Sequence, residues 1–316
     1  MEYIRTHTVE FDTGPSCRLS VDSPSGATVV EGRDTERVRV QIIAHLWEES
    51  ASDADDTMAR VLRGVRHENA SVRIEIPSLR SAGPWFFFGR GSRVDLQIEA
   101  PRDTAVRIAS RSGRVEVVQV TGPVEIEQRS GRATVIGVRR NVQIASRSGA
   151  IEAEDIGGDV ILRSRTGKVT VRRVAGDVTV QSRTGAVQVE GTDGDVDIES
   201  RTGRIVIERA QGDVRAVTTT GAISVAEAGG RVHLEATTGA VRYRGAVLGD
   251  IDIRVTTGAI TLEIDPDRPF FLDAETVTGR IASDLRPRRE GAPPAGAPSV
   301  RLRAVTGAIT IKRLSP

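Results

Sequence analysis

Apolar and polar residues alternate along most of this chain, in short runs that each follow a glycine. After Gly185, for example, Val187 and Val189 are apolar, and Gln188 between them is polar. A period of two residues places alternate side chains on opposite faces of a β-strand. The apolar positions are mostly β-branched, which suits side chains that pack on a pleated surface. The pattern predicts many short strands, each with one buried face.

The glycines of this pattern recur at a fixed spacing. A Ser-Gly or Thr-Gly pair returns every 18 residues through seven intervals, and then at intervals of 19, 21 and 28 residues. The glycines of this first series are Gly113, Gly131, Gly149, Gly167, Gly185, Gly203, Gly221, Gly239, Gly258, Gly279 and Gly307. A second series lies nine residues after members of the first, at Gly122, Gly158, Gly176, Gly194, Gly212 and Gly230. Such repetition indicates a stack of similar structural units.

Each 18-residue unit is interpreted as one rung, formed by two short strands and two tight corners. Glycine at a corner permits a positive φ and a close approach of two backbones. Rungs stacked in register, about 4.8 Å apart, bury their apolar faces in a thin core between two sheets. The predicted fold is an all-β, two-sided parallel β-solenoid. Right-handed winding is expected from the general bias of parallel crossovers.

The two ends depart from this regularity. Residues 1–105 contain strand-like runs without the 18-residue period, although a Ser25-Gly26 corner has the form of an early rung. Residues 106–316 form the regular solenoid, interrupted by a Pro-rich segment at 286–299 that is predicted to be a loop. We expect one continuous domain. Its N-terminal region and last irregular rungs should cap the stack, because bare sheet edges recruit other chains.

A short helix is expected inside the N-terminal region. Within residues 53–66, Met58, Val61, Leu62 and Val65 lie three or four positions apart or side by side, which is the pattern of one helix face. The segment is predicted to be an insertion between strands.

Composition narrows the possible functions. Charged residues make up 28% of the chain but balance to a net charge of +1, so the whole molecule does not attract nucleic acid or acidic membranes. Cys17 is the only cysteine, which excludes a disulfide framework and a thiolate metal site. The four histidines lack metal-ligand spacing, and the sequence has no nucleophile elbow or phosphate-binding loop. We therefore expect no enzymatic activity, no metal and no cofactor.

Two further features concern location. No window of the sequence approaches the roughly 18 consecutive apolar residues of a membrane-spanning helix. The N-terminal residues also lack the apolar run of a signal peptide. A cytoplasmic location is expected, with no membrane span.

An arginine occupies the position two residues before the first-series glycine in six successive rungs. These candidate binding residues are Arg111, Arg129, Arg147, Arg165, Arg183 and Arg201. Counting from the apolar positions of the same strand, Gln128 points into the core and Arg129 points to solvent. Register should align the six side chains along one exposed edge, where like charges about 4.8 Å apart repel. Stacked guanidinium groups, nearby carboxylates such as Glu127 and Glu199, or a bound anionic polymer would offset that repulsion. Alternatively, the row has no binding role: duplication of the repeat copied the arginine from rung to rung, and the side chains simply face solvent.

Two other rows have structural interpretations. Threonines before the later first-series glycines, at Thr220, Thr238, Thr257, Thr278 and Thr306, are expected to form corner hydrogen bonds. Aspartates follow several second-series glycines or their equivalents, at Asp159, Asp177, Asp195, Asp213 and Asp250. Nine-residue repeats with Gly and Asp are also typical of calcium-binding β-rolls. Here the rest of the Gly-Gly-x-Gly-x-Asp pattern is missing, which disfavours calcium.

Four of the ten aromatic residues form one run, Trp85, Phe86, Phe87 and Phe88, between flanks that contain Gly and Pro. We expect this run to fold over the open end of the solenoid as a hydrophobic cap. The alternative is an exposed contact patch for a partner or for a second copy of the chain.

Two motifs connect the chain with a known family. The run from Leu19 to Gly26 reads Leu-Ser-Val-Asp-Ser-Pro-Ser-Gly, and the rungs repeat Ser-Arg-Ser/Thr-Gly-x-Val-x-Val. In these motifs the chain resembles the "putative adhesin" β-strand-repeat family of bacteria, which is similar to the toast-rack domains of envelope-stress proteins. The resemblance covers most of the chain and implies the β-solenoid fold. It implies no specific activity, because the family has no agreed one, and family members are often surface-associated.

These observations favour a non-catalytic, adhesin-like binding or scaffold module whose partner is an unknown protein or an anionic polymer. One alternative is a self-assembling structural polymer, in which rungs stack end to end between chains as in bactofilin-like filaments; such a chain would be a homo-oligomer. A polysaccharide-active enzyme is less favoured, because the regular rungs leave no residues for the walls of a cleft.

Overall fold

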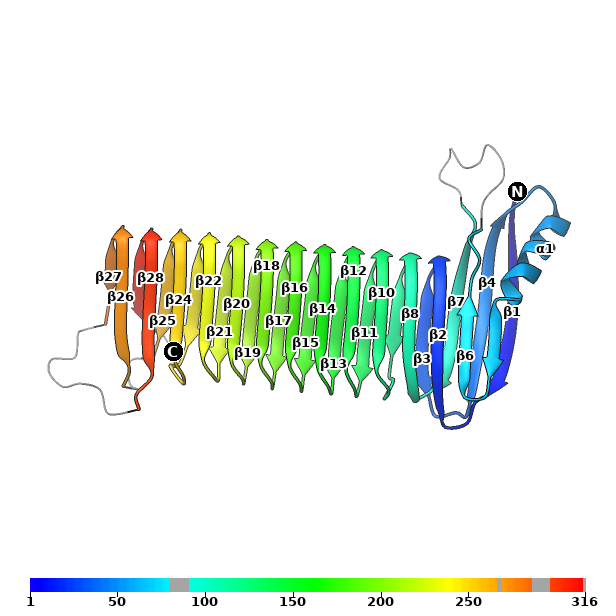
Figure 1. The fold of residues 1–316 in the computed structure, drawn as a ribbon, viewed down its shortest axis with the longest axis horizontal. Helices are drawn as coiled ribbons and strands as arrows, with labels where there is room; N and C mark the ends of the chain where they lie inside the picture. The colour runs from blue at the N-terminus through cyan, green and yellow to red at the C-terminus, as the bar shows by residue number, and fades with distance from the viewer. Residues whose placement is uncertain (80–90, 266–268, 286–295, 315–316) are drawn as a thin grey trace. The chain divides into compact units, whose positions relative to one another are not determined.

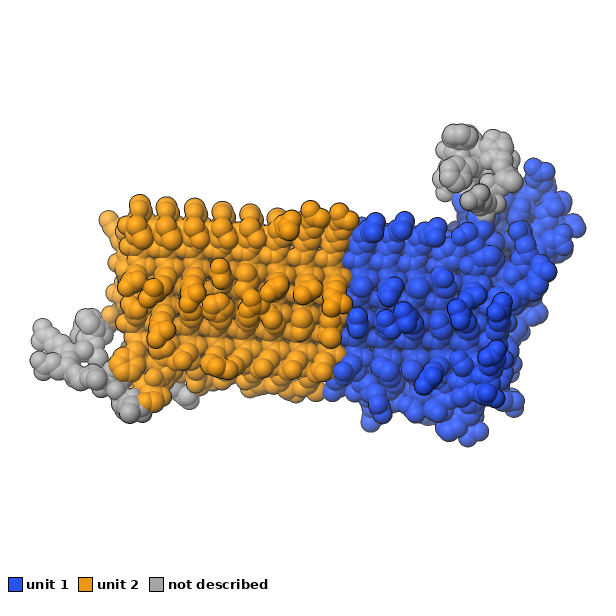
Figure 2. Space-filling model, in the orientation of Figure 1, with its two compact units in different colours: residues 1–158 blue, residues 159–316 orange. Residues whose placement is uncertain are grey.

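The fold is known from a computed structural model, which describes residues 1–79, 91–265, 269–285 and 296–314 (Figure 1). The chain divides into two compact units, residues 1–158 and residues 159–316 (Figure 2). The aromatic run Trp85–Phe88 and residues 286–295 of the predicted loop lie outside the described residues.

Unit 1 contains most of the irregular elements. Its elements are β1 (Glu2–Asp12), β2 (Ser16–Ser25), β3 (Thr28–Arg33), β4 (Arg37–Trp47), α1 (Ala51–Leu62), β5 (Val65–Glu68), β6 (Ser71–Glu75), β7 (Arg93–Pro101), β8 (Asp103–Ser112), β9 (Val115–Val118), β10 (Val124–Ser130), β11 (Ala133–Val138), β12 (Val142–Ser148) and β13 (Ile151–Ile156).

The strands of unit 1 form two sheets. One sheet has the order β1-β4-β7-β3-β9-β11-β13, and the other has the order β12-β10-β8-β2-β6-β5. The regular strands pair in parallel, as predicted, with β10 between β8 and β12 and β11 between β9 and β13. The early rung is confirmed, because Leu19 of β2 pairs with Val106 and Thr28 of β3 pairs with Val115. At the irregular end, β4 pairs antiparallel with β1 and β7, and β5 pairs antiparallel with β6.

Unit 2 is the more regular part. Its strands are β14 (Val160–Thr166), β15 (Val169–Val174), β16 (Val178–Thr184), β17 (Val187–Thr192), β18 (Val196–Thr202), β19 (Ile205–Ala210), β20 (Val214–Thr220), β21 (Ile223–Ala228), β22 (Val232–Thr238), β23 (Val241–Gly245), β24 (Ile251–Thr257), β25 (Ile260–Ile264), β26 (Phe271–Thr278), β27 (Ile281–Ser283), β28 (Ser299–Thr306) and β29 (Ile309–Arg313).

The two sheets of unit 2 are parallel throughout their described strands, with the orders β15-β17-β19-β21-β23-β25-β29-β27 and β26-β28-β24-β22-β20-β18-β16-β14. Pairing joins equivalent positions of neighbouring rungs, so Val187 lies beside Ile205 and Val189 lies beside Ile207. Val187, Ile205 and Ile207 are 0% exposed. The core is thus a set of stacked aliphatic columns, which explains how the chain folds with few aromatic residues. The predicted two-sided solenoid is confirmed; its right-handed winding stays a prediction.

The first-series glycines form a column within each unit. A Cβ atom placed on Gly131 in unit 1 would lie 1.8 Å from the carbonyl oxygen of Gly113, and one placed on Gly185 in unit 2 would lie 1.9 Å from that of Gly167. Gly131 and Gly185 also have φ angles of 121° and 143°. Each corner is therefore packed directly against the corner of the neighbouring rung, which leaves no room for a side chain. The 18-residue spacing arises from this contact.

A further series of bends, found in both units, lies outside the glycine pattern. In or just after each odd-numbered strand from β9 to β21, one residue has a left-handed conformation with φ between 51° and 69°. These residues are Gln119, Gly137, Asp155, Arg173, Gly191, Arg209 and Glu227, again 18 positions apart. Only two of them are glycine, so composition did not reveal the bend.

Replacing Glu227 by glycine is expected to stabilise the chain by about 0.5–1 kcal/mol. The left-handed conformation costs a non-glycine residue about 1–2 kcal/mol, which exceeds the extra chain entropy that glycine loses on folding. Glu208→Gly is the matched control; because Glu208 lies within β19 and does not have a positive φ, its replacement should cost about 0.5–1 kcal/mol. Urea unfolding measures both. Destabilisation by Glu227→Gly would mean that the bend imposes no strain.

The predicted helix is present but shifted. It spans Ala51–Leu62 rather than residues 53–66, and begins at Ser50, whose hydroxyl accepts a hydrogen bond from the Asp53 N–H at 3.1 Å while the Asp53 carboxylate accepts one from the Ser50 N–H. This reciprocal pair fixes the helix start earlier than the apolar pattern indicated. Val65 had the right spacing for the helix, but it belongs to β5, which pairs with β6.

The last rung of unit 2 in space is not the last in the chain. The last irregular rungs were expected to cap the stack, and chain order would place the β28–β29 rung at its end. It lies instead between the β24–β25 rung and the β26–β27 rung. In the β26–β27 rung the inward residues Leu272 and Ile281 are 40% and 42% exposed, whereas Val300 and Ile309 beside them are 0% exposed. The β26–β27 rung therefore covers the rung inside it, while its own apolar face stays partly open.

Candidate functional site

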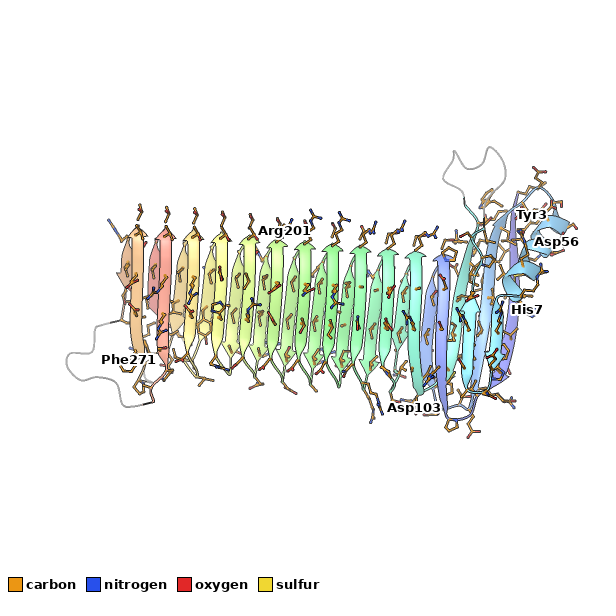
Figure 3. All side chains as sticks on the ribbon, viewed as in Figure 1. Tyr3, His7, Asp56, Asp103, Arg201 and Phe271 are labelled. Atoms are coloured by element: carbon orange, nitrogen blue, oxygen red, sulfur yellow. The ribbon has the colours of Figure 1, made fainter. Side chains whose placement is uncertain are left out.

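The six candidate arginines lie at the corners where the even-numbered strands end. In unit 1, Arg129 lies in register with Arg111 on one side and Arg147 on the other, because the residues that flank them are paired across β8, β10 and β12. In unit 2, Arg183 lies in the same way between Arg165 and Arg201. All six side chains are exposed, as predicted. Arg201 lies at the tips of the strand arrows in Figure 3.

These two sets of three residues are called the arginine rows. No carboxylate of the described residues lies within ion-pair distance of them. The carboxylates expected to compensate them are engaged elsewhere: Glu127 lies 3.7 Å from Arg107, and Glu199 lies 2.9 Å from Arg215. That part of the sequence prediction is wrong. At bulk dielectric, charges about 4.8 Å apart repel by about 0.9 kcal/mol per pair before screening. The rows therefore carry uncompensated positive charge.

A column of threonines accompanies the arginine row in unit 2. Its members are Thr166, Thr184, Thr202, Thr220, Thr238, Thr257, Thr278 and Thr306, paired rung to rung. All are exposed, and their hydroxyls form no hydrogen bond with the described residues. In unit 1 the equivalent Ser112 and Ser130 do bond at the corner, since their hydroxyls donate to Pro24 O at 3.3 Å and to Arg111 O at 3.2 Å. The corner bonds expected for the threonines are therefore wrong. Thr166, Thr184 and Thr202 directly follow an arginine of the row and offer free hydroxyls beside its guanidinium groups, whereas the other five threonines follow a threonine or a valine.

The aspartates of the sequence row lie at the other set of corners, which precede the even-numbered strands, and they link neighbouring rungs. The Asp177 carboxylate accepts the backbone N–H of Asp195 at 2.8 Å, and the Asp195 carboxylate accepts that of Asp213 at 2.7 Å. The carboxylate of each of these aspartates thus accepts a hydrogen bond from a backbone N–H of the next rung. The row has a structural role, and no group of His, Cys, Asp or Glu side chains in the described part of the chain has the geometry to hold a metal ion.

Acid should weaken these corner bonds. The backbone N–H and then the guanidinium of Arg231 hold the pKa of Asp213 below its usual value of 3.8. Stability from a depressed carboxyl pKa is present above about pH 4 and lost as the pH falls through the folded pKa. Asp213→Asn keeps an acceptor oxygen without the titration, so its stability should fall less steeply below about pH 4 than that of the wild type. Urea unfolding at several pH values measures this.

The matched control for that measurement is Asp193→Asn, because the Asp193 carboxylate makes no hydrogen bond in the described structure and is exposed. The free energy of unfolding of this control should fall below about pH 4 as steeply as that of the wild type. Equal slopes for Asp213→Asn and the wild type would contradict the assigned role.

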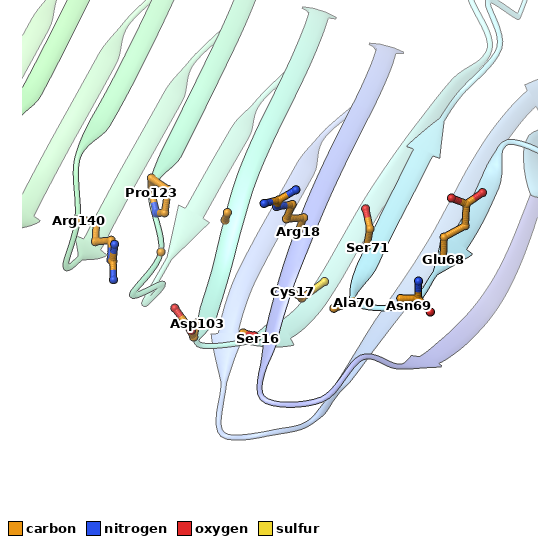
Figure 4. A pocket seen from close by; sticks show the side chains of 12 residues that line it. Ser16, Cys17, Arg18, Glu68, Asn69, Ala70, Ser71, Asp103, Pro123 and Arg140 are labelled. Carbon is orange, nitrogen blue, oxygen red and sulfur yellow. The ribbon is translucent and has the colours of Figure 1, made fainter.

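A shallow groove of about 560 Å³ lies at the corner of unit 1 near Asp103 (Figure 4). Arg18, Glu68 and Arg140 line it together with Cys17, so both signs of charge are present. Burial raises the pKa of the Cys17 thiol, which keeps it protonated at neutral pH and unreactive as a nucleophile. The lining residues come from separate segments of the sequence, and no sequence pattern identified this groove.

The repeated corners and the two-sheet stack agree with a known family. A family model described as Toastrack DUF4097 matches residues 138–312, which is more than half of the chain. The chain belongs to the Toastrack family. The resemblance expected from the Ser-Arg-Ser/Thr-Gly motif is thereby confirmed.

Three solved structures are similar to this Toastrack chain. A "putative cell adhesion protein" from Clostridium sporogenes is 11% identical, with a TM-score of 0.23, and the match covers 99% of this chain and 100% of that one. A "putative lipid binding protein" from Parabacteroides distasonis is 9% identical (TM-score 0.33; 98% and 97% covered). A "putative adhesin" from Bacteroides fragilis is 10% identical (TM-score 0.24; 98% and 97% covered). No curated protein matches the chain.

The Toastrack chain also has no helix, among the residues that the structure describes, with the length and apolar character to cross a bilayer.

Proposed function

We propose that this Toastrack chain is a non-catalytic binding module whose arginine rows bind a linear acidic polysaccharide. The supporting observation is that the rows present one exposed guanidinium per rung without a carboxylate partner. Guanidinium groups bind carboxylates and sulfates through paired hydrogen bonds, so a chain of regularly spaced anions fits such a row. Binding would offset the repulsion between neighbouring arginines.

The residues beside the rows favour a glycan over a nucleic-acid strand. The free threonine hydroxyls of unit 2 can exchange hydrogen bonds with sugar hydroxyls. Proteins that bind single-stranded nucleic acid stack the bases on aromatic side chains, and the arginine rows have none among their described neighbours on the same edge. An acidic polysaccharide can therefore bind both the arginines and the threonine hydroxyls, whereas a nucleic-acid strand would use the arginines alone.

Self-association is the second candidate, supported by the partly exposed Leu272 and Ile281 at the end of unit 2. An exposed apolar sheet end can pair with another chain. Sedimentation over a concentration series distinguishes the two: a polymer grows with concentration, and a binding module stays one size.

Affinity for a sulfated glycan, heparin, and a carboxylated one, polygalacturonate, tests the proposal. The triple variant Arg165/Arg183/Arg201→Ser should bind about ten- to a hundredfold more weakly, because each exposed charge contact contributes about 0.5–1 kcal/mol. The slope of log affinity against log salt should fall by about 2, since three ionic contacts are lost.

The control Arg242/Arg244/Arg301→Ser removes the same charge from exposed positions of unit 2 outside the corners that carry the arginine row. It should change affinity less than threefold. Equal losses in both triple variants would show nonspecific attraction, and tighter binding of oligothymidylate than of either glycan would favour the nucleic acid. Release of shortened polygalacturonate would contradict the non-catalytic assignment.

A further inference from the structure

A column of polar side chains lies inside the core, three residues before the first-series glycines. Its members are Ser110, Gln128 and Ser146 in unit 1, and Ser164, Ser182, Ser200 and Thr218 in unit 2. Each is at most 8% exposed. They lie on the inward face of the even-numbered strands, directly under the arginine rows.

The hydroxyls of these residues have no protein partner, whereas that of Ser23, which lies beside Ser110 in the neighbouring rung, donates to Ser25 O of its own rung at 3.5 Å. The Oγ atoms of the five serines and the Oγ1 atom of Thr218 are buried and accept or donate no hydrogen bond within the protein. A buried polar group without a partner costs about 1–3 kcal/mol, so nearly all such groups in native proteins are paired. One isolated case could be tolerated. The same deficit in rung after rung indicates a partner that recurs with the rungs.

Two residues in equivalent positions show where that partner must bind. In unit 1 the Gln128 side-chain amide nitrogen donates to Gly113 O of the neighbouring rung at 2.6 Å and to Ser130 O of its own rung at 3.0 Å. In unit 2 the Thr276 hydroxyl donates to Gly307 O of the neighbouring rung at 3.1 Å. The glycine carbonyl of the neighbouring rung is thus an available acceptor at this corner.

A serine side chain is shorter than glutamine by two heavy atoms, which is close to the length of one hydrogen bond to water, about 2.8 Å. The amide nitrogen of Gln128 therefore occupies the place that a water molecule would take in a serine rung. At that place a water can accept from the serine hydroxyl and donate to the two carbonyls. Three hydrogen bonds are typical of a buried water.

We infer that each serine or Thr218 rung holds one internal water at its corner. Beside Ser182 the water is bonded to Gly167 O and Thr184 O, and beside Ser200 it is bonded to Gly185 O and Thr202 O. The waters form a file along the inside of each unit, under the arginine row. Rungs with an apolar residue at this position, such as Ala236 and Val255, hold none.

A high-resolution crystal structure of the full chain tests this directly. In the wild type, a density peak is expected within hydrogen-bond distance of Ser182 Oγ, Gly167 O and Thr184 O, with none at the corner beside Ala236. In Ser182→Gln the peak at residue 182 should disappear and the amide nitrogen should take its place, while the peak beside Ser200 remains.

Thermal unfolding provides a second measurement. Ser182→Gln should keep a higher Tm than Ser182→Val, because its amide nitrogen donates to the corner carbonyls, although its amide oxygen, like that of Gln128, has no protein partner. Ser182→Val should lower the Tm, because it excludes the water and removes the donor to Gly167 O, while Thr184 O keeps its hydrogen bond from the Gly167 N–H. The inference is overturned if the corner is empty, if the Ser182 hydroxyl bonds directly to a protein atom, or if Ser182→Gln is less stable than Ser182→Val.

Discussion

Replacing Gly185 by alanine is expected to lower the free energy of unfolding by about 3 kcal/mol or more. The new Cβ would lie 1.9 Å from Gly167 O, and no side-chain rotation can relieve a contact between a Cβ and a neighbouring backbone. Overpacking costs about 1–3 kcal/mol, and the φ of 143° adds about 1–3 kcal/mol of strain for a residue with a side chain. Urea unfolding followed by circular dichroism measures the change.

Gly191 provides the matched control in the same rung. It also has a positive φ, 69°, but a Cβ there would lie no closer than 3.8 Å to a neighbouring atom. Gly191→Ala should therefore cost only the left-handed strain, about 1–2 kcal/mol. Similar losses for the two variants would show that corner contacts do not determine the spacing.

Much of the fold could be predicted from the sequence because one physical contact repeats. Gly131 and Gly185 are glycines for the same reason: a carbonyl oxygen of the neighbouring rung occupies the place where a Cβ atom would lie. Because this corner position has room only for glycine, the sequence shows glycine at a clear 18-residue period. The alternation of Val187, Gln188 and Val189 is visible for a similar reason, because the two valines are buried in the core and Gln188 is not.

Other features leave a weaker trace. The left-handed bend at Asp155, Arg173, Arg209 and Glu227 tolerates a side chain, so glycine is not required there and no period appears in the composition. The position of the β28–β29 rung depends on the path of the chain between rungs. An interval of 28 residues indicates irregularity but not which neighbour a strand joins.

The candidate site was predictable only in part. Alternation correctly placed Gln128 in the core and Arg129 in solvent. The partners of Glu127 and Glu199 could not be inferred, because long side chains reach residues of neighbouring columns as readily as those of their own. The buried hydroxyls under the arginine rows needed burial and hydrogen-bond geometry to be noticed, since a serine near a corner is ordinary in sequence.

The largest expected effect comes from changing the number of residues in one rung. Deleting residues 189–206 removes one 18-residue period and joins Gln188 to Ile207, which then takes the inward place of Val189. The shortened chain should fold and unfold cooperatively, because stability in a stacked repeat is a sum over neighbouring rungs. Its loss of stability should be that of one rung and its interface.

Deleting residues 189–205 instead removes one residue fewer and differs from the first deletion only by keeping Val206. Val206 then takes the inward place and Ile207 points to solvent, because a slip of one residue exchanges the two faces of a strand. Every later residue up to the next corner is displaced as well. This variant should lack a cooperative transition or aggregate.

Unfolding of these two deletion variants, followed side by side by circular dichroism, decides whether stacked 18-residue rungs specify the structure. Stacking in register predicts a cooperative transition for the shorter chain and none for the chain that keeps one more residue. Equal stability of the two would contradict it.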